Sequence, residues 1–186
     1  MMKQRNVPLV PTIYVLDYII EQGEKTGIPP DRIAKARALQ AERDRAIRAA
    51  FGAGLTIAFG SDTIFPHETA NREFARMVRL GLSPMGAIKA ATANAAGVLG
   101  IEKDTGTLEV GKRADVVVLD LEADHLVPLY NPISHLAYAA RSGDVRTVVI
   151  DGQVVLEDRR LLTLDEAEAR RQVRVLATAI AARHRE

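Results

Sequence analysis

Residues 55–62 of the chain read LTIAFGSD, and this stretch decides the fold that the sequence predicts. Residues 55–60 are largely apolar at both odd and even positions, so a strand here is expected to be buried on both faces. Such a strand suits the parallel sheet of an α/β protein, because helices cover both sides of that sheet. Asp62 follows directly after the Gly-Ser step that ends the apolar run.

The position of Asp62 suggests a chemical role. In a parallel α/β sheet the carboxyl ends of the strands form the floor of the active site. A carboxylate delivered there can hold a metal ion or accept a proton from a metal-bound water. The competing interpretation is that Asp62 only caps the next turn, since aspartate after Gly-Ser is common in turns. The local sequence alone favours the capping interpretation.

The first fifty residues predict an irregular start and then a long helix. Residues 7–11, VPLVP, are short and apolar, but Pro8 lacks a donor, so a strand here needs an edge or a special position. Residues 12–22 are expected to form a short helix or an irregular loop. Asp31 is predicted to cap a long helix that ends at Gly52, because apolar residues recur at helical spacing while Lys and Arg fill the other face.

The middle of the chain predicts two more helices. Residues 71–80 are expected to form the first, which ends at Gly81. Ser83 is predicted to cap the second, with Pro84 at its first position. The second helix is rich in alanine and is expected to continue to about Gly100, lying close against a neighbour.

The last third of the chain changes character and predicts strands. Residues 114–119 form a β-rich run, and residues 144–156 are expected to form two strands joined by a tight turn at Asp151-Gly152. The stretch 163–166 has the pattern of a capping box and is predicted to open a last helix that runs to about Arg183. The order is therefore βα units, then strands, then a terminal helix.

Composition limits the classes of partner and site. The chain has 186 residues, a net charge of +1, 4% aromatic residues and no tryptophan, so a nucleic-acid partner is not expected. It has no cysteine, which excludes disulfides and thiolate metal sites and fits a cytoplasmic protein. No run of 18 apolar residues occurs, so no membrane partner is expected. A small-molecule substrate is the expected partner.

Several motifs together resemble those of one known superfamily. They occur in the order GSD at 60–62, HETANRE at 67–73, SPMGAIKAATANAAGVLG at 83–100 and GTLEVGKRADVVVLD at 106–120. In this order they resemble the C-terminal part of the metal-dependent amidohydrolase superfamily, especially its imidazolonepropionase-like and Xaa-Pro-dipeptidase-like group. The stretch 131–166 looks more like the deaminase and chlorohydrolase branch of the same superfamily.

The resemblance implies a fold. It predicts an α/β protein made of the C-terminal βα units of a TIM-type metallo-hydrolase barrel, followed by part of a flanking β-sandwich and a terminal helix. The corresponding domains are residues 1–100 for the partial barrel, 101–160 for the β-sandwich portion and 161–186 for the C-terminal helix.

The resemblance also implies an activity. It predicts a hydrolase that acts on a non-peptide carbon–nitrogen bond of an amide, a cyclic amide or an amidine-type group. Asp62 would be the metal ligand and the general base, and the metal would be a divalent ion, most often zinc in this superfamily. His67 and Asn71 lie where related enzymes place substrate-contacting groups, although a histidine after proline in a loop is usually just exposed.

The histidines predict an incomplete metal site. The chain has four, namely His67, His125, His135 and His184, none in a His-x-His pair and none before Asp62. A catalytic metal needs at least three converging ligands, which one aspartate cannot supply. The sequence therefore predicts a fragment of a longer enzyme that is inactive alone. Its open strand edges would need a homo-oligomer or a partner. The alternatives are a non-catalytic remnant or assembly module, and part of a nucleobase-type deaminase.

Overall fold

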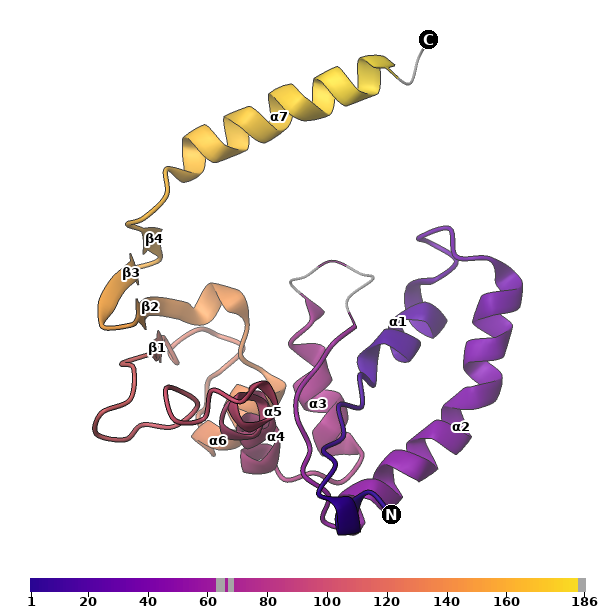
Figure 1. Cartoon of the computed structure of the whole chain (residues 1–186). Coiled ribbons are helices and arrows are strands. Elements are labelled where there is room, and N and C mark those ends of the chain that lie inside the picture. The colour runs from indigo at the N-terminus through magenta and orange to yellow at the C-terminus, as the bar shows by residue number, and fades with distance from the viewer. Residues whose placement is uncertain (63–65, 67–68, 184–186) are drawn as a thin grey trace. The chain divides into compact units, whose positions relative to one another are not determined.

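The chain folds into two compact units. The computed structural model describes residues 1–62, 66 and 69–183. Unit 1 comprises residues 1–112 and 121–142, and unit 2 comprises residues 113–120 and 143–186. Figure 1 shows the order of the helices and strands along the chain. None of the described helices is long and apolar enough to cross a membrane.

Two extended segments pair in parallel inside unit 1. Leu9 and Ile57 form an isolated parallel bridge. The Leu9 amide donates to the Thr56 carbonyl at 2.9 Å, and the Ala58 amide donates to the Leu9 carbonyl at 3.0 Å. The predicted parallel pairing of residues 55–60 is therefore present, but as one bridge rather than a full strand. The prolines on either side of Leu9 have no amide hydrogen, which limits the length of the ladder.

Two helices follow the first extended segment. A 3₁₀ turn, η1, covers Lys3–Arg5, and helix α1 covers Tyr14–Gln22, so the helical alternative for residues 12–22 is confirmed. Helix α2 covers Pro30–Gly52, as expected for the long helix. The predicted cap at Asp31 is wrong, because Pro29 is the N-cap and Asp31 lies in the first turn. Proline at the first helical position already has the helical φ, so the helix begins before Asp31.

Helix α3 covers Arg72–Arg79 and confirms the helix expected at 71–80. Helix α4 covers Pro84–Ala91, and the Ser83 Oγ accepts a hydrogen bond from the Gly86 amide at 3.0 Å. The predicted serine cap is therefore confirmed.

The alanine-rich helix is shorter than predicted, because it breaks at Thr92. Helix α5 covers Ala93–Leu99 as a separate element, and Thr92 between the two helices has φ −120° and ψ −94°. The Thr92 hydroxyl donates to the Ile88 carbonyl at 2.9 Å. Such side-chain bonds compete with the helical ladder. The Ala90 carbonyl accepts from the Phe59 amide at 2.9 Å, which ties the end of α4 to the extended segment.

The apolar core of unit 1 gathers around the extended segments. Ala87 and Ala90 of α4 are fully buried, so the expected close approach of the alanine-rich helix is confirmed. Helix α6 covers Pro132–Tyr138 and is capped by Asn131. The main core cluster consists of Ile13, Ile47, Ile57, Met77, Leu80, Ala87 and Ala90.

Unit 2 contains a four-stranded antiparallel sheet with the strands in sequence order. Ile150 pairs with Gln153 across a two-residue turn. Asp151 and Gly152 in that turn have φ values of 53° and 76°, so the predicted tight hairpin is confirmed. The strands are β1 Val116–Leu119, β2 Val145–Ile150, β3 Gln153–Glu157 and β4 Arg160–Leu161, and a 3₁₀ turn, η3, covers Ser142–Asp144.

Helix α7 covers Glu166–Arg183 and ends the described chain. The Asp165 Oδ1 accepts a hydrogen bond from the Glu168 amide at 3.0 Å. The predicted capping box is therefore wrong in its register, because Asp165 and not Thr163 bonds the first turn. The helix starts two residues later than that box requires.

Candidate functional site

Asp62 lies two residues beyond Gly60, after the segment that pairs with Leu9. Its backbone is left-handed, with φ 47°, and the residue is exposed. Aspartate is one of the few residues that adopt this conformation readily. No group of three His, Asp or Glu side chains that could hold a metal ion occurs among residues 1–62, 66 and 69–183. Asp62 is thus a single carboxylate and not part of a complete metal site within the described chain.

Several bonds fix the segment that leads to Asp62. The Phe59 amide donates to the Ala90 carbonyl at 2.9 Å, and the Asn94 Nδ2 donates to the Ile57 carbonyl at 2.8 Å. Helices α4 and α5 therefore satisfy backbone groups of the segment that the short bridge leaves unpaired. These bonds fix the backbone just before Gly60, Ser61 and Asp62.

Gly60 lies close to Val10 and Thr12, at the end of the first extended segment. A Cβ at residue 60 would lie 2.5 Å from Val10 Cγ1 and 3.4 Å from Thr12 Cγ2, so a larger side chain there requires a shift. Thr12 has φ 42°, which is a rare value for a β-branched residue. The ends of both parallel segments therefore carry left-handed residues, Thr12 and Asp62, and side chains of the first segment lie close to Gly60 of the second.

The two predicted substrate-binding residues have different outcomes. His67 lies outside the described residues. Asn71 is exposed just before α3, and its Nδ2 donates to the Ala140 carbonyl after α6 at 3.1 Å. Asn71 thus links α3 to the chain after α6, and whether it also contacts a substrate stays a prediction.

Asn71 also lines an open groove of about 610 Å³ within unit 1. Arg72, His125 and Arg141 lie around it, and Asp62 is not among the lining residues. The Arg72 Nη1 donates to the Tyr14 hydroxyl at 3.0 Å, and its guanidinium lies 5.7 Å from the centre of that ring. Sequence reasoning assigned no function to Arg72, at the start of α3, or to His125, since neither belongs to a spacing pattern that indicates a site.

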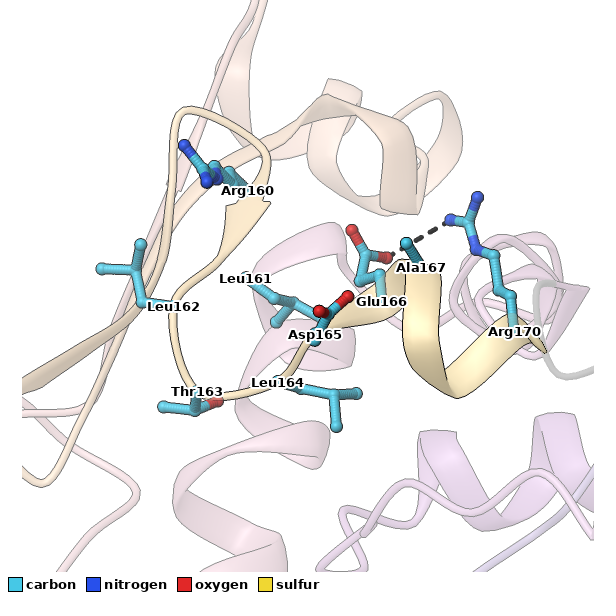
Figure 2. A pocket seen from close by; sticks show the side chains of 9 residues that line it. All are labelled: Arg160, Leu161, Leu162, Thr163, Leu164, Asp165, Glu166, Ala167 and Arg170. Carbon is cyan, nitrogen blue, oxygen red and sulfur yellow. Dashed lines mark hydrogen bonds and ion pairs between the residues drawn. The ribbon is translucent and has the colours of Figure 1, made fainter. Parts of the chain in front are cut away.

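A second hollow lies in unit 2, between β4 and the first turn of α7. It encloses about 680 Å³ and is lined by residues 160–167 and Arg170. Figure 2 shows the ion pair between Glu166 and Arg170, at 3.3 Å, beside it. The hollow is therefore walled mainly by one continuous stretch of chain, and four of its lining residues are charged, namely Arg160, Asp165, Glu166 and Arg170.

A buried carboxylate in unit 1 was missed by the sequence analysis. Glu73 of α3 is fully buried, and its carboxylate accepts from the Ile13 amide at 2.8 Å and the Tyr14 amide at 2.6 Å. Burial raises the pKa of Glu73, although these two hydrogen bonds and the nearby Arg43 act in the opposite direction. A local signal existed, because Glu73 precedes the buried Met77 by four residues and so lies on the apolar face of the helix.

Arginines from α2 and α3 bond the start of α1, where the Glu73 carboxylate also accepts its hydrogen bonds. The Arg43 Nη1 of α2 donates to the Ile13 carbonyl at 2.8 Å, and its Nη2 lies 3.1 Å from Asp17 Oδ1. Arg76 of α3 pairs with Asp17 and, at 2.6 Å, with Asp44 Oδ2. The first turn of α1 is thus held by α2 and by α3.

The family comparison decides the affiliation of the chain. Residues 1–155 match the Amidohydrolase family. This chain belongs to that family. Because the match covers far more than half of the chain, the resemblance stated from the motifs is confirmed.

The individual relatives differ in what their names say. A 5-methylthioadenosine/S-adenosylhomocysteine deaminase from Syntrophobacter fumaroxidans is 53% identical over 93 residues, which are 50% of this chain and 21% of the relative. A Xaa-Pro dipeptidase solved with bound methionine has a TM-score of 0.65 at 30% identity, over 82% of this chain and 35% of that one. A mutant of atrazine chlorohydrolase TrzN from Arthrobacter aurescens TC1, solved with zinc and atraton, has a TM-score of 0.55 at 26% identity, over 73% and 31%.

The coverage of these relatives is limited. The chain spans about a fifth of the length of the deaminase and about a third of each of the two solved chains. The family and an α/β arrangement with a small antiparallel sheet are shown. The activity that each relative is named for is that of a protein much longer than this chain.

Proposed function

We propose that this chain is part of a metal-dependent hydrolase that cleaves a non-peptide carbon–nitrogen bond. The observation that carries the proposal is Asp62, which follows a segment paired in parallel with Leu9 inside the region that matches the Amidohydrolase family. Asp62 is the proposed metal ligand and general base. The proposed architecture is the C-terminal portion of a TIM-type barrel, which the single parallel bridge and the flanking helices support.

The proposed reaction is removal of an exocyclic amine from an adenosine derivative. The relative named for that reaction is 53% identical, whereas the dipeptidase is 30% identical over a longer stretch. This favours the deaminase alternative of the sequence analysis over cleavage of an amide. His67 and Asn71 are proposed to contact the substrate.

The proposed cofactor is a divalent metal ion, and the zinc in the TrzN structure supports that choice. The described residues do not fit a complete metal site, because they bring no three His, Asp or Glu side chains together. Asp62 would therefore supply one ligand of several. The domain division at residues 100 and 160, the cytoplasmic location and the homo-oligomer also stay predictions.

A complementation experiment tests the proposal. The chain is co-expressed with a version of the S. fumaroxidans deaminase that lacks the segment corresponding to this chain, and zinc is supplied. Ammonia release from 5′-methylthioadenosine is then measured. We expect neither polypeptide to be active alone and the pair to be active, because only the pair contains a full set of ligands.

Asp62→Asn is the decisive variant in that experiment. Asparagine tolerates a left-handed backbone, so the turn is kept while the carboxylate is lost. Asp151→Asn makes the same change at another left-handed aspartate, with φ 53°, in the hairpin of unit 2. We expect Asp62→Asn to abolish activity and Asp151→Asn to retain it. An Asp62→Asn pair as active as the natural pair would contradict the proposal.

A second candidate is a non-catalytic assembly module of the same family. The absence of a three-ligand cluster among the described residues favours it. In the experiment above, this candidate predicts that the pair assembles, as seen by co-purification, but releases no ammonia.

A further inference from the structure

The N-terminal turn of α1 is capped by a side chain distant in the sequence. The first amides of a helix have no partner within the helix, and Ile13, the N-cap, offers no side-chain cap. The Glu73 carboxylate, 60 residues further along the chain, accepts from the Ile13 amide at 2.8 Å. It also accepts from the Tyr14 amide at 2.6 Å. A carboxylate at this end of a helix also interacts favourably with the helix dipole.

A second charged side chain bonds the same turn. The Arg43 Nη1 donates to the Ile13 carbonyl at 2.8 Å. Both polar groups of the Ile13 backbone are therefore bonded to charged side chains from different helices. Ile13 is itself fully buried in the main core cluster. The turn is thus fixed by charge-assisted bonds and by packing.

This turn lies close to Gly60, two residues before Asp62. Thr12 immediately precedes Ile13, and its Cγ2 would lie 3.4 Å from a Cβ at Gly60. Val10 packs still closer to that position. Because the two extended segments run parallel, their carboxyl ends lie at the same edge, with little free space between the Val10 and Thr12 side chains and Gly60.

We propose that Glu73 is a positioning residue for the Asp62 site. Its carboxylate holds the turn at residues 12–14, and that turn, packed on Gly60, sets the backbone from which Asp62 departs. The inference rests on the proposed role of Asp62. A purely structural role for Glu73 as a helix cap predicts a loss of stability without a change at Gly60 and Ser61.

Amide measurements on the full chain separate these two roles. In Glu73→Gln, one of the two accepting oxygens becomes an amide group, so we expect the Ile13 and Tyr14 amides to exchange with solvent roughly tenfold or more faster. We also expect the nuclear magnetic resonance signals of the Gly60 and Ser61 amides to shift. Unchanged signals at Gly60 and Ser61 would overturn the inference.

Asp44→Asn is the matched control. It makes the same change in a carboxylate of unit 1 that pairs with Arg43 Nη2 at 2.6 Å and Arg76 at 2.6 Å, but it leaves in place both acceptors of Glu73 and the bond from Arg43 Nη1 to the Ile13 carbonyl. We expect it to lower stability while leaving the Gly60 and Ser61 signals unchanged. If Glu73→Gln fails to fold, Arg43→Gln removes the other hold on Ile13 and is expected to shift the same two signals.

Activity is measured separately in the complemented enzyme. At equal folded fraction, Glu73→Gln is expected to lower kcat by roughly tenfold, as loss of a charge-assisted bond that positions a reacting group predicts, while KM changes little. An unchanged kcat would overturn the inference. If the natural pair is itself inactive, the proposed function fails, and the Gly60 and Ser61 signals still decide whether Glu73 positions this backbone.

Discussion

Glu73 gives unit 1 a specific dependence of stability on pH. Burial raises its pKa above the ordinary value of 4.5. A carboxyl group with a raised pKa in the folded state contributes stability below its unfolded pKa, and this contribution is lost as the pH rises through the folded value. We therefore predict that, as the pH rises from below 4.5 to neutral, the free energy of unfolding of the natural chain falls relative to that of Glu73→Gln.

Urea unfolding at a series of pH values measures this difference. Arg43 lowers the pKa of Glu73 and Asp17 raises it, so the difference between the two proteins reports Glu73 with both of these neighbours in place. Parallel stability curves for the natural chain and Glu73→Gln would show that the pKa of Glu73 is not raised.

At the residue scale, sequence reasoning succeeds where the partner is local. Ser83 bonds an amide three residues away, and the Asp151-Gly152 turn needs only its own two residues. Glu73 bonds amides 60 and 59 residues away, so no local pattern names its partners. Asp62 is a candidate from the strand before it and from the family resemblance, and its role stays a prediction, whereas Glu73 closes the HETANRE motif with no pattern that indicates its bonding partners.

At the scale of elements, α4 is held at its start by the Ser83 cap and at its end by the bond between the Ala90 carbonyl and the Phe59 amide. The Ser83 cap can be tested by itself. Ser83→Ala removes the acceptor for the Gly86 amide, which lies 3.0 Å away. We predict a loss of about 1 kcal/mol in the free energy of unfolding, the usual cost of losing a serine N-cap. Thermal unfolding followed by far-ultraviolet circular dichroism measures it.

Ser83→Asp serves as the control for that prediction. Aspartate is as good an N-cap as serine, and its charge is favourable at the start of a helix. We expect its stability to match or exceed that of the natural chain. An equal loss in both variants would mean that the side-chain bond at Ser83 contributes nothing and that the serine matters for another reason.

The elements that the sequence could not place depend on neighbours distant in the chain. The alanine-rich stretch was expected as one helix, yet it divides at Thr92, two residues after Ala90, whose carbonyl accepts from the Phe59 amide. The extended segment at residues 55–60 was expected as a full strand, but its partner is limited by the prolines around Leu9. In both cases the length of the element depends on a partner distant in the chain together with local features, namely the Thr92 hydroxyl bond and the prolines around Leu9.

At the scale of the whole molecule, the two units differ in how much apolar surface they bury. Every apolar side chain counted as buried in the described chain belongs to unit 1. In unit 2 the described strands leave much of their apolar surface accessible, with Val117 54% exposed and Ile150 53% exposed. Since burial of apolar surface is the main source of stability, unit 1 should be the more stable of the two.

We predict that unit 2 unfolds at a lower urea concentration than unit 1. All four tyrosines lie in the residue ranges of unit 1, so their near-ultraviolet circular dichroism reports that unit alone. Hydrogen exchange of the Val148 and Val149 amides, which lie in the sheet, reports unit 2. Ile33→Ala, at a buried site of α2, should lower only the tyrosine transition. Coincident transitions that shift together in this variant would instead mean that the two units unfold as one cooperative body.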